Sequence, residues 1–309
     1  MKNQLTPVII VAVCALALGP LCTGFFGPEW RAKWLLASAA NQFQNEQFDE
    51  AESTLQRATE LSADLATDPE FWKLKFEIVL NKKNASQEVY SRLYEDSLSQ
   101  IAKTPPAYQA DFAHAVGSLL HQCQQNQLAV EILEKFFPPI AKRTPNENNS
   151  LAYFRSKTKK GLETALLEID AALVKDGTSQ VEFLDTKAWV LHGLNKNELA
   201  LTFVQEAIRK KNESVGKLDE DESKVLQKWL FAASDVQEIE TAPVSNKLEE
   251  LKKRFPVYDP KGLNDLARGV AALRFHRACI LDELGRTEDS ELDYAWLDSF
   301  GFQETDKLN

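Results

Sequence analysis

The chain carries four histidines and four cysteines, the side chains most often used for metal binding and nucleophilic catalysis. His114 and His121 are seven residues apart, a rise of about 10 Å on one helix, which is too far for their rings to share a metal ion. Cys123 and Cys279 are the only cysteines after residue 28, and their wide spacing indicates neither a metal site nor a disulfide framework. The sequence holds no phosphate-binding loop, Gly-x-Ser-x-Gly elbow, His-Glu-x-x-His or paired Cys-x-x-Cys motif. We therefore expect no metal, no other cofactor and no enzymatic activity.

The composition favours helices and argues against nucleic-acid binding. Acidic residues outnumber basic ones by 46 to 36, for a net charge of −10, whereas a nucleic-acid-binding protein needs a basic face. No glycine occurs between Gly27 and Gly117, and no proline between Pro145 and Pro243. Such long stretches without helix breakers favour an all-α fold over a turn-rich β-fold.

The first 28 residues predict a membrane anchor. Residues 5–26 form an uncharged run of 22, and about 20 apolar residues suffice to span a bilayer as a helix. The alternative is a cleaved export signal that ends near Ala15-Leu16-Ala17, which would leave the protein secreted or periplasmic. We expect an uncleaved single-pass helix with the large domain on the extracytoplasmic side of the membrane.

A pattern of small and large residues recurs along the rest of the chain. A small residue is followed four positions later by a large apolar or aromatic one, and these first positions, here called the repeat anchors, are Ala51, Ala129, Ala165, Ala200 and Ser290. The middle three anchors are 36 and 35 residues apart, and the outer steps of 78 and 90 leave room for further repeats. Twelve residues before the anchors lie Ala39, Gly117, Tyr153, Ala188 and Ala278, small in four cases of five. Small residues at both positions would let consecutive helices pack closely.

This pattern resembles the tetratricopeptide repeat, a helix–turn–helix unit of 34 residues. The best matches are residues 183–210 and 271–297, with a further match over 34–63, whereas 66–103 and 214–256 keep helical periodicity without the signature. The resemblance implies a right-handed all-α solenoid of degenerate repeats over residues 30–300, preceded by the anchor in 1–28 and followed by a tail of 301–309. An irregular helical bundle is the alternative.

The resemblance also implies a binding groove, because in this family the first helix of each pair lines the concave side. Carrying the repeat register back from the anchors gives four groove positions in each of three repeats. They are Asp111, His114, Ser118 and His121, then Glu147, Ser150, Phe154 and Lys157, then Glu182, Asp185, Trp189 and His192. This mixed aromatic and polar wall suits a peptide with some positive charge, with Trp189 as its hot spot. Alternatively, Trp189 and Phe154 are buried in helix packing, and His114 and His121 are ordinary surface residues.

The sequence thus predicts a membrane-tethered scaffold that binds a protein or peptide partner during export or envelope assembly. The competing hypothesis is a catalytic or cofactor-binding helical protein, with its site in residues 66–103 or 214–256.

Overall fold

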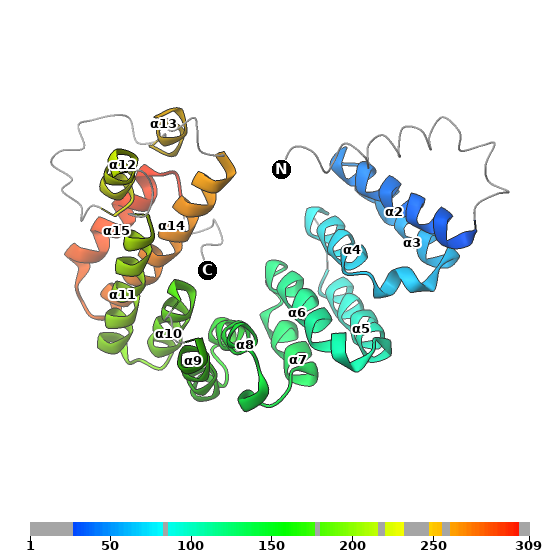
Figure 1. Cartoon of the computed structure of the whole chain (residues 1–309), viewed down its shortest axis with the longest axis horizontal. Coiled ribbons are helices and arrows are strands. Elements are labelled where there is room, and N and C mark those ends of the chain that lie inside the picture. Colours follow the sequence, from blue (N-terminus) through cyan, green and yellow to red (C-terminus); the bar gives the residue numbers. More distant parts are fainter. Residues whose placement is uncertain are drawn as a thin grey trace. The chain divides into compact units, whose positions relative to one another are not determined.

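The computed structural model describes residues 27–82, 86–176, 180–215, 220–231, 247–254 and 260–302 (Figure 1). Within these ranges every regular element is a helix, which confirms the predicted all-α class. None of the helices in these ranges is long and apolar enough to cross a membrane. The predicted anchor at residues 5–26 lies outside the described residues, as does most of the predicted tail.

The chain divides into two compact units at Phe137–Pro138. Unit 1 contains, in chain order, α2 (Pro28–Gln44), α3 (Phe48–Leu61), a 3-10 turn (Ala63–Thr67), α4 (Pro69–Asn81), α5 (Gln87–Lys103), α6 (Pro106–Gln122) and α7 (Asn126–Phe136). Helix α2 pairs with α3 and α6 pairs with α7, while α4 packs against both α3 and α6. The core of this unit includes the fully buried side chains of Trp72, Phe76 and Leu120.

Unit 2 is built from three helical pairs. Its elements are a 3-10 turn (Ile140–Lys142), α8 (Pro145–Thr158), α9 (Leu162–Asp176), α10 (Val181–Gly193), α11 (Asn197–Val215), α12 (Glu220–Phe231), α13 (Lys247–Arg254), α14 (Pro260–Glu283) and α15 (Thr287–Ser299). The pairs are α8 with α9, α10 with α11, and α14 with α15. Helix α10 also packs against α8 and α9, and α14 packs against α11 and α10.

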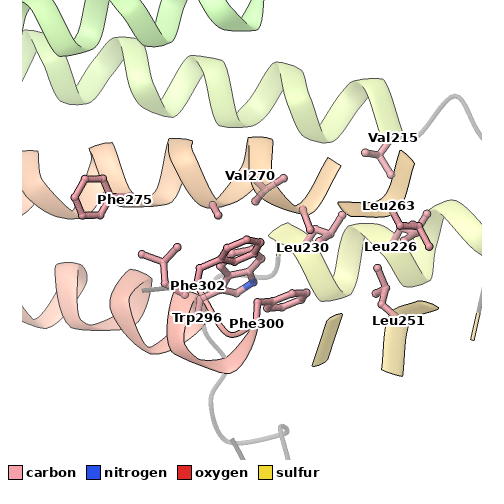
Figure 2. Packing of buried hydrophobic residues seen from close by; sticks show 13 residues of the cluster. Val215, Leu226, Leu230, Leu251, Leu263, Val270, Phe275, Trp296, Phe300 and Phe302 are labelled. Carbon is pink, nitrogen blue, oxygen red and sulfur yellow. The ribbon is translucent and has the colours of Figure 1, made fainter. Parts of the chain in front are cut away.

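In the described part of the long step between the last two anchors, α12 and α13 pack on α14 rather than forming a further pair between α11 and α14. Helix α14 packs directly on α11, and α12 and α13 pack against the N-terminal part of α14. Figure 2 shows Leu226 and Leu230 of α12, together with Leu251 of α13, in one apolar cluster with Leu263 and Trp296. This segment therefore contributes core to the last pair.

The small residues of the sequence pattern lie where paired helices meet. All five anchors are buried, as are four of the five residues twelve positions earlier. At Gly117 of α6, an added Cβ would lie 3.1 Å from Leu133 Cδ2 of α7, so a larger side chain would force the Leu133 side chain to shift. Tyr153, the large exception in the pattern, is only partly buried.

Four of the helical pairs are joined by the same turn. Glu46, Gln124, Asn195 and Gly285 each lie five residues before an anchor and adopt left-handed φ angles of 60°, 62°, 58° and 71°. In each turn the next residue donates its N–H to a carbonyl five residues back, at 2.8–2.9 Å. This is the Schellman arrangement, which satisfies carbonyls left free at a helix end. Its recurrence at one register gives the chain a helical, repeat-like character.

Candidate functional site

Helices α8, α10 and α14 bring five polar and aromatic residues together in unit 2. This cluster, here called the Lys157 site, consists of Tyr153, Lys157, Asp185, Trp189 and His276. The Trp189 ring stacks on the His276 ring with centroids 4.2 Å apart and planes 23° apart. Lys157 Nζ lies 4.7 Å from the centroid of the Trp189 ring and 4.9 Å from that of Tyr153. The ammonium group is therefore held by aromatic rings of two neighbouring helices.

Local sequence explains why these side chains share a face. Tyr153 and Lys157 are four residues apart on α8, as are Asp185 and Trp189 on α10, and this spacing puts each pair on one side of its helix. Helix α8 is fixed at its start by a capping box, in which the Thr144 side chain accepts from the Glu147 backbone N–H at 3.2 Å and the Glu147 carboxylate accepts from the Thr144 backbone N–H at 2.6 Å.

Lys157 has an unusual electrostatic environment. Its Nζ atom is buried and forms no hydrogen bond. Burial lowers the pKa of Lys157 to about 8, although the nearby Asp185 carboxylate acts in the opposite direction. Burial also disfavours the charged form of Tyr153, so it raises the pKa of this hydroxyl, and the charge of Asp185 raises it further. Aromatic faces attract the ammonium electrostatically but do not replace the hydrogen bonds that it makes in water.

Asp185 forms a hydrogen bond with a histidine and none with Lys157. Its Oδ1 atom lies 2.8 Å from Nδ1 of His276, a side chain that is only 2% exposed. With Nδ1 donating to the carboxylate, a ring that carries one proton has Nε2 as an acceptor. That Nε2 atom is buried and has no partner. The site thus contains two buried polar atoms without hydrogen bonds, one on the ammonium and one on the imidazole.

The groove candidates of unit 1 lie on helix α6. Asp111 is exposed and His114 is half-buried. The Ser118 hydroxyl donates to the His114 carbonyl at 2.9 Å, within helix α6. His121 Nδ1 lies 2.6 Å from Asn126 Oδ1, across the turn between α6 and α7.

The same histidine–asparagine contact recurs in unit 2. His192 Nδ1 lies 2.9 Å from Asn197 Oδ1, across the turn between α10 and α11. Each of these histidines lies eight residues before an anchor and each asparagine three before it. His121 and His192 therefore tie the end of one helix to the start of the next. Sequence reasoning missed this role, although the repeated His-x4-Asn spacing was visible.

Four of the remaining groove candidates, all in unit 2, lie outside the Lys157 site. Glu147 caps α8 and Phe154 is buried, in agreement with the alternative interpretation that Phe154 takes part in helix packing. Ser150 is half-buried and Glu182 is exposed.

Lys157, Asp185 and Trp189 are brought together in the site, with His192 beside them. The ring centroid of His192 lies 5.0 Å from that of Trp189. Sequence reasoning missed Tyr153 and His276. The only signal for Tyr153 was its bulk at a position that is small in the other repeats.

The described parts of the segments named in the competing hypothesis include core residues. Trp72 and Phe76 of α4 and Leu226 and Leu230 of α12 are buried apolar packing residues. Within the described residues, no group of three histidine, cysteine or acidic side chains is arranged to hold a metal ion. No protein-family model matches the chain, and no curated protein matches it either.

Proposed function

We propose that this protein is a membrane-tethered scaffold that binds a peptide or protein partner at the Lys157 site. Residues 5–26 anchor it, and residues 30–300 form a solenoid resembling tetratricopeptide repeats on the extracytoplasmic side. The partner lies along the face of α8 and α10 that carries the groove positions. A role in export or envelope assembly suits this arrangement.

One observation supports a binding role above the others: the Lys157 ammonium is buried against Trp189 without a hydrogen-bond acceptor. A buried polar group without a partner destabilises the folded protein by about 1–3 kcal/mol, and more when it is charged. Such a group persists most readily where a ligand completes its hydrogen bonds. Trp189 is only partly buried, so its indole ring offers apolar surface to that ligand.

Site-directed photo-crosslinking in intact cells tests this proposal. A photoreactive amino acid replaces Glu182, which is exposed and lies three and seven residues before Asp185 and Trp189 on α10. The matched control is Val174 on α9, which is 83% exposed and lies outside the site. We expect a discrete adduct from position 182 that is absent from position 174.

Trp189→Ala then tests whether the aromatic ring carries the binding. We expect the adduct from position 182 to fall at least tenfold, as loss of an interface hot spot should cause. The melting temperature should change little. Adducts of equal yield from positions 174 and 182 would contradict the proposal. A loss of about 3–5 kcal/mol in folding stability on Trp189→Ala, typical of a core aromatic, would also contradict it.

A further inference from the structure

The hydrogen bonds missing from the Lys157 site define what a ligand must supply. Lys157 Nζ carries three N–H donors and has no acceptor, and His276 Nε2 is also unpartnered. Both groups contact Trp189, one through its ammonium at 4.7 Å and the other through ring stacking at 4.2 Å. A completing ligand therefore needs an acceptor for the ammonium and an N–H or O–H donor for the imidazole.

The charges around the ammonium favour an anionic group. Asp185 is the acid that acts on Lys157, and its Oδ1 already accepts from His276. Glu147, the acidic groove candidate on α8, is used in the capping box at the far end of that helix. The sequence predicted a partner with some positive charge, because it placed several acids along the groove. In the structure neither Asp185 nor Glu147 gives Lys157 Nζ a hydrogen bond, so the site lacks an acceptor for this ammonium.

We propose that the Lys157 site binds the side-chain carboxylate of an aspartate or glutamate in the partner peptide, an inference that rests on the proposed function. One carboxylate oxygen accepts from Lys157, and a backbone N–H of the same peptide donates to His276 Nε2. The peptide backbone or a neighbouring apolar side chain lies over Trp189. Charge-assisted hydrogen bonds of this kind are roughly twice as strong as neutral ones.

This assignment makes binding depend on pH in a definite direction. The pKa of Lys157 is about 8 in the free protein, and a bound carboxylate would bring it back toward the ordinary value of 10.5. Between these values, binding takes up a proton. At pH 9.5 only about 3% of the free protein carries the protonated ammonium, so affinity should fall about thirtyfold from its value at pH 7.

The experiment is calorimetric titration of the full-length protein in detergent micelles with two tripeptides. Both are blocked at their ends and differ only in a central glutamate or glutamine. At pH 7 we expect the glutamate peptide to bind at least tenfold more tightly, a difference of about 1.4 kcal/mol. Lys157→Met should abolish this preference.

A control variant separates local from general charge effects. Lys187 is also partly buried over an aromatic ring, Phe203, but it has a carboxylate partner, with Nζ 2.7 Å from Asp170 Oδ1. Lys187→Met should leave the glutamate preference unchanged. Equal binding of the two peptides, no binding of the glutamate peptide at about 10 mM, or a preference that survives Lys157→Met would each overturn the carboxylate assignment. None of these results would alter the crosslinking from position 182, which tests the binding role itself.

Discussion

Replacing Lys157 with methionine should make the protein more stable. Methionine keeps the length of the apolar stem, which packs beside Tyr153 and Trp189, and removes the buried ammonium. Replacing buried charges with apolar side chains of similar volume often stabilises proteins by 1–4 kcal/mol. A variant that improves folding and abolishes binding would show that the lysine is present for a ligand.

The magnitude follows from the pKa of Lys157. A fall from 10.5 to about 8 means that the folded state disfavours the charged form by about 3 kcal/mol. The attraction of the ammonium to the aromatic rings offsets part of this gain in the variant, by about 1 kcal/mol. The net gain at pH 7 is therefore about 2 kcal/mol. For a unit of this size, that corresponds to a melting temperature about 4–8 °C higher.

The stability gained by Lys157→Met should depend on pH. Below pH 8 the lysine is protonated in both states, so the penalty is fully present. Between pH 8 and 10.5 the unfolded chain binds more protons than the folded one, so the stability of the natural protein rises with pH. At pH 9.5 about 2 kcal/mol is recovered, and the advantage of Lys157→Met should fall to near zero.

Thermal melts of the full-length protein in detergent, followed by tryptophan fluorescence at pH 7.0 and 9.5, measure both quantities. Lys187→Met is the matched control, because that ammonium already has a carboxylate partner. It should lower stability slightly or leave it unchanged at both pH values. A melting temperature for Lys157→Met that is lower than that of the natural protein, or an equal gain at both pH values, would contradict this prediction.

Two further predictions test the framework that holds the site. Gln124→Gly should raise stability by about 0.5–1 kcal/mol, because a left-handed backbone conformation is unfavourable for glutamine and not for glycine. For the same reason Gly285→Ala should lower stability by about 1 kcal/mol. Thermal melts measure both changes. The opposite signs would show that the shared turn is not strained at Gln124. Asp293→Asn should cost about 3 kcal/mol, because its buried carboxylate accepts from two arginines, whereas the exposed Asp289→Asn should change the melt little. Equal melting temperatures for these two variants would mean that the buried carboxylate does not contribute to folding stability.

The sequence predicted those parts of the structure that depend on local spacing. The small residues twelve positions apart correctly predicted where paired helices meet. The period of a helix and the length of a turn depend only on residues close in the sequence. The groove register also put Asp185 and Trp189 on one face of α10. It did not select His276, which lies 91 residues after Asp185 in the chain. Those two residues meet only because α14 packs beside α10 and α11, and no local pattern predicts that α12 and α13 pack on α14.

The burial of Phe154 shows a second limit of the register. Groove positions in the repeat family are assigned by helical spacing, and Phe154 lies on the same register face as Ser150 and Lys157. In the structure Phe154 is nevertheless buried, with only 5% of the residue exposed. Which side of a helix is covered depends on the neighbouring helices, so a register can select the right helix face and still misplace a residue at its edge.

Two buried carboxylates of unit 2 have cationic partners, unlike the Lys157 ammonium, which has no acceptor. Glu168 is fully buried, and its two oxygens accept from Arg143 at 2.7 Å and Arg155 at 3.0 Å. Asp293 is equally buried, and it accepts from Arg274 at 2.9 Å and Arg277 at 2.6 Å. In both places two cations complete one buried acid. A unit that pairs its buried carboxylates so fully has the means to pair a lysine as well. Lys157 instead faces two aromatic rings without an acceptor, and our proposal of a partner carboxylate rests on this contrast.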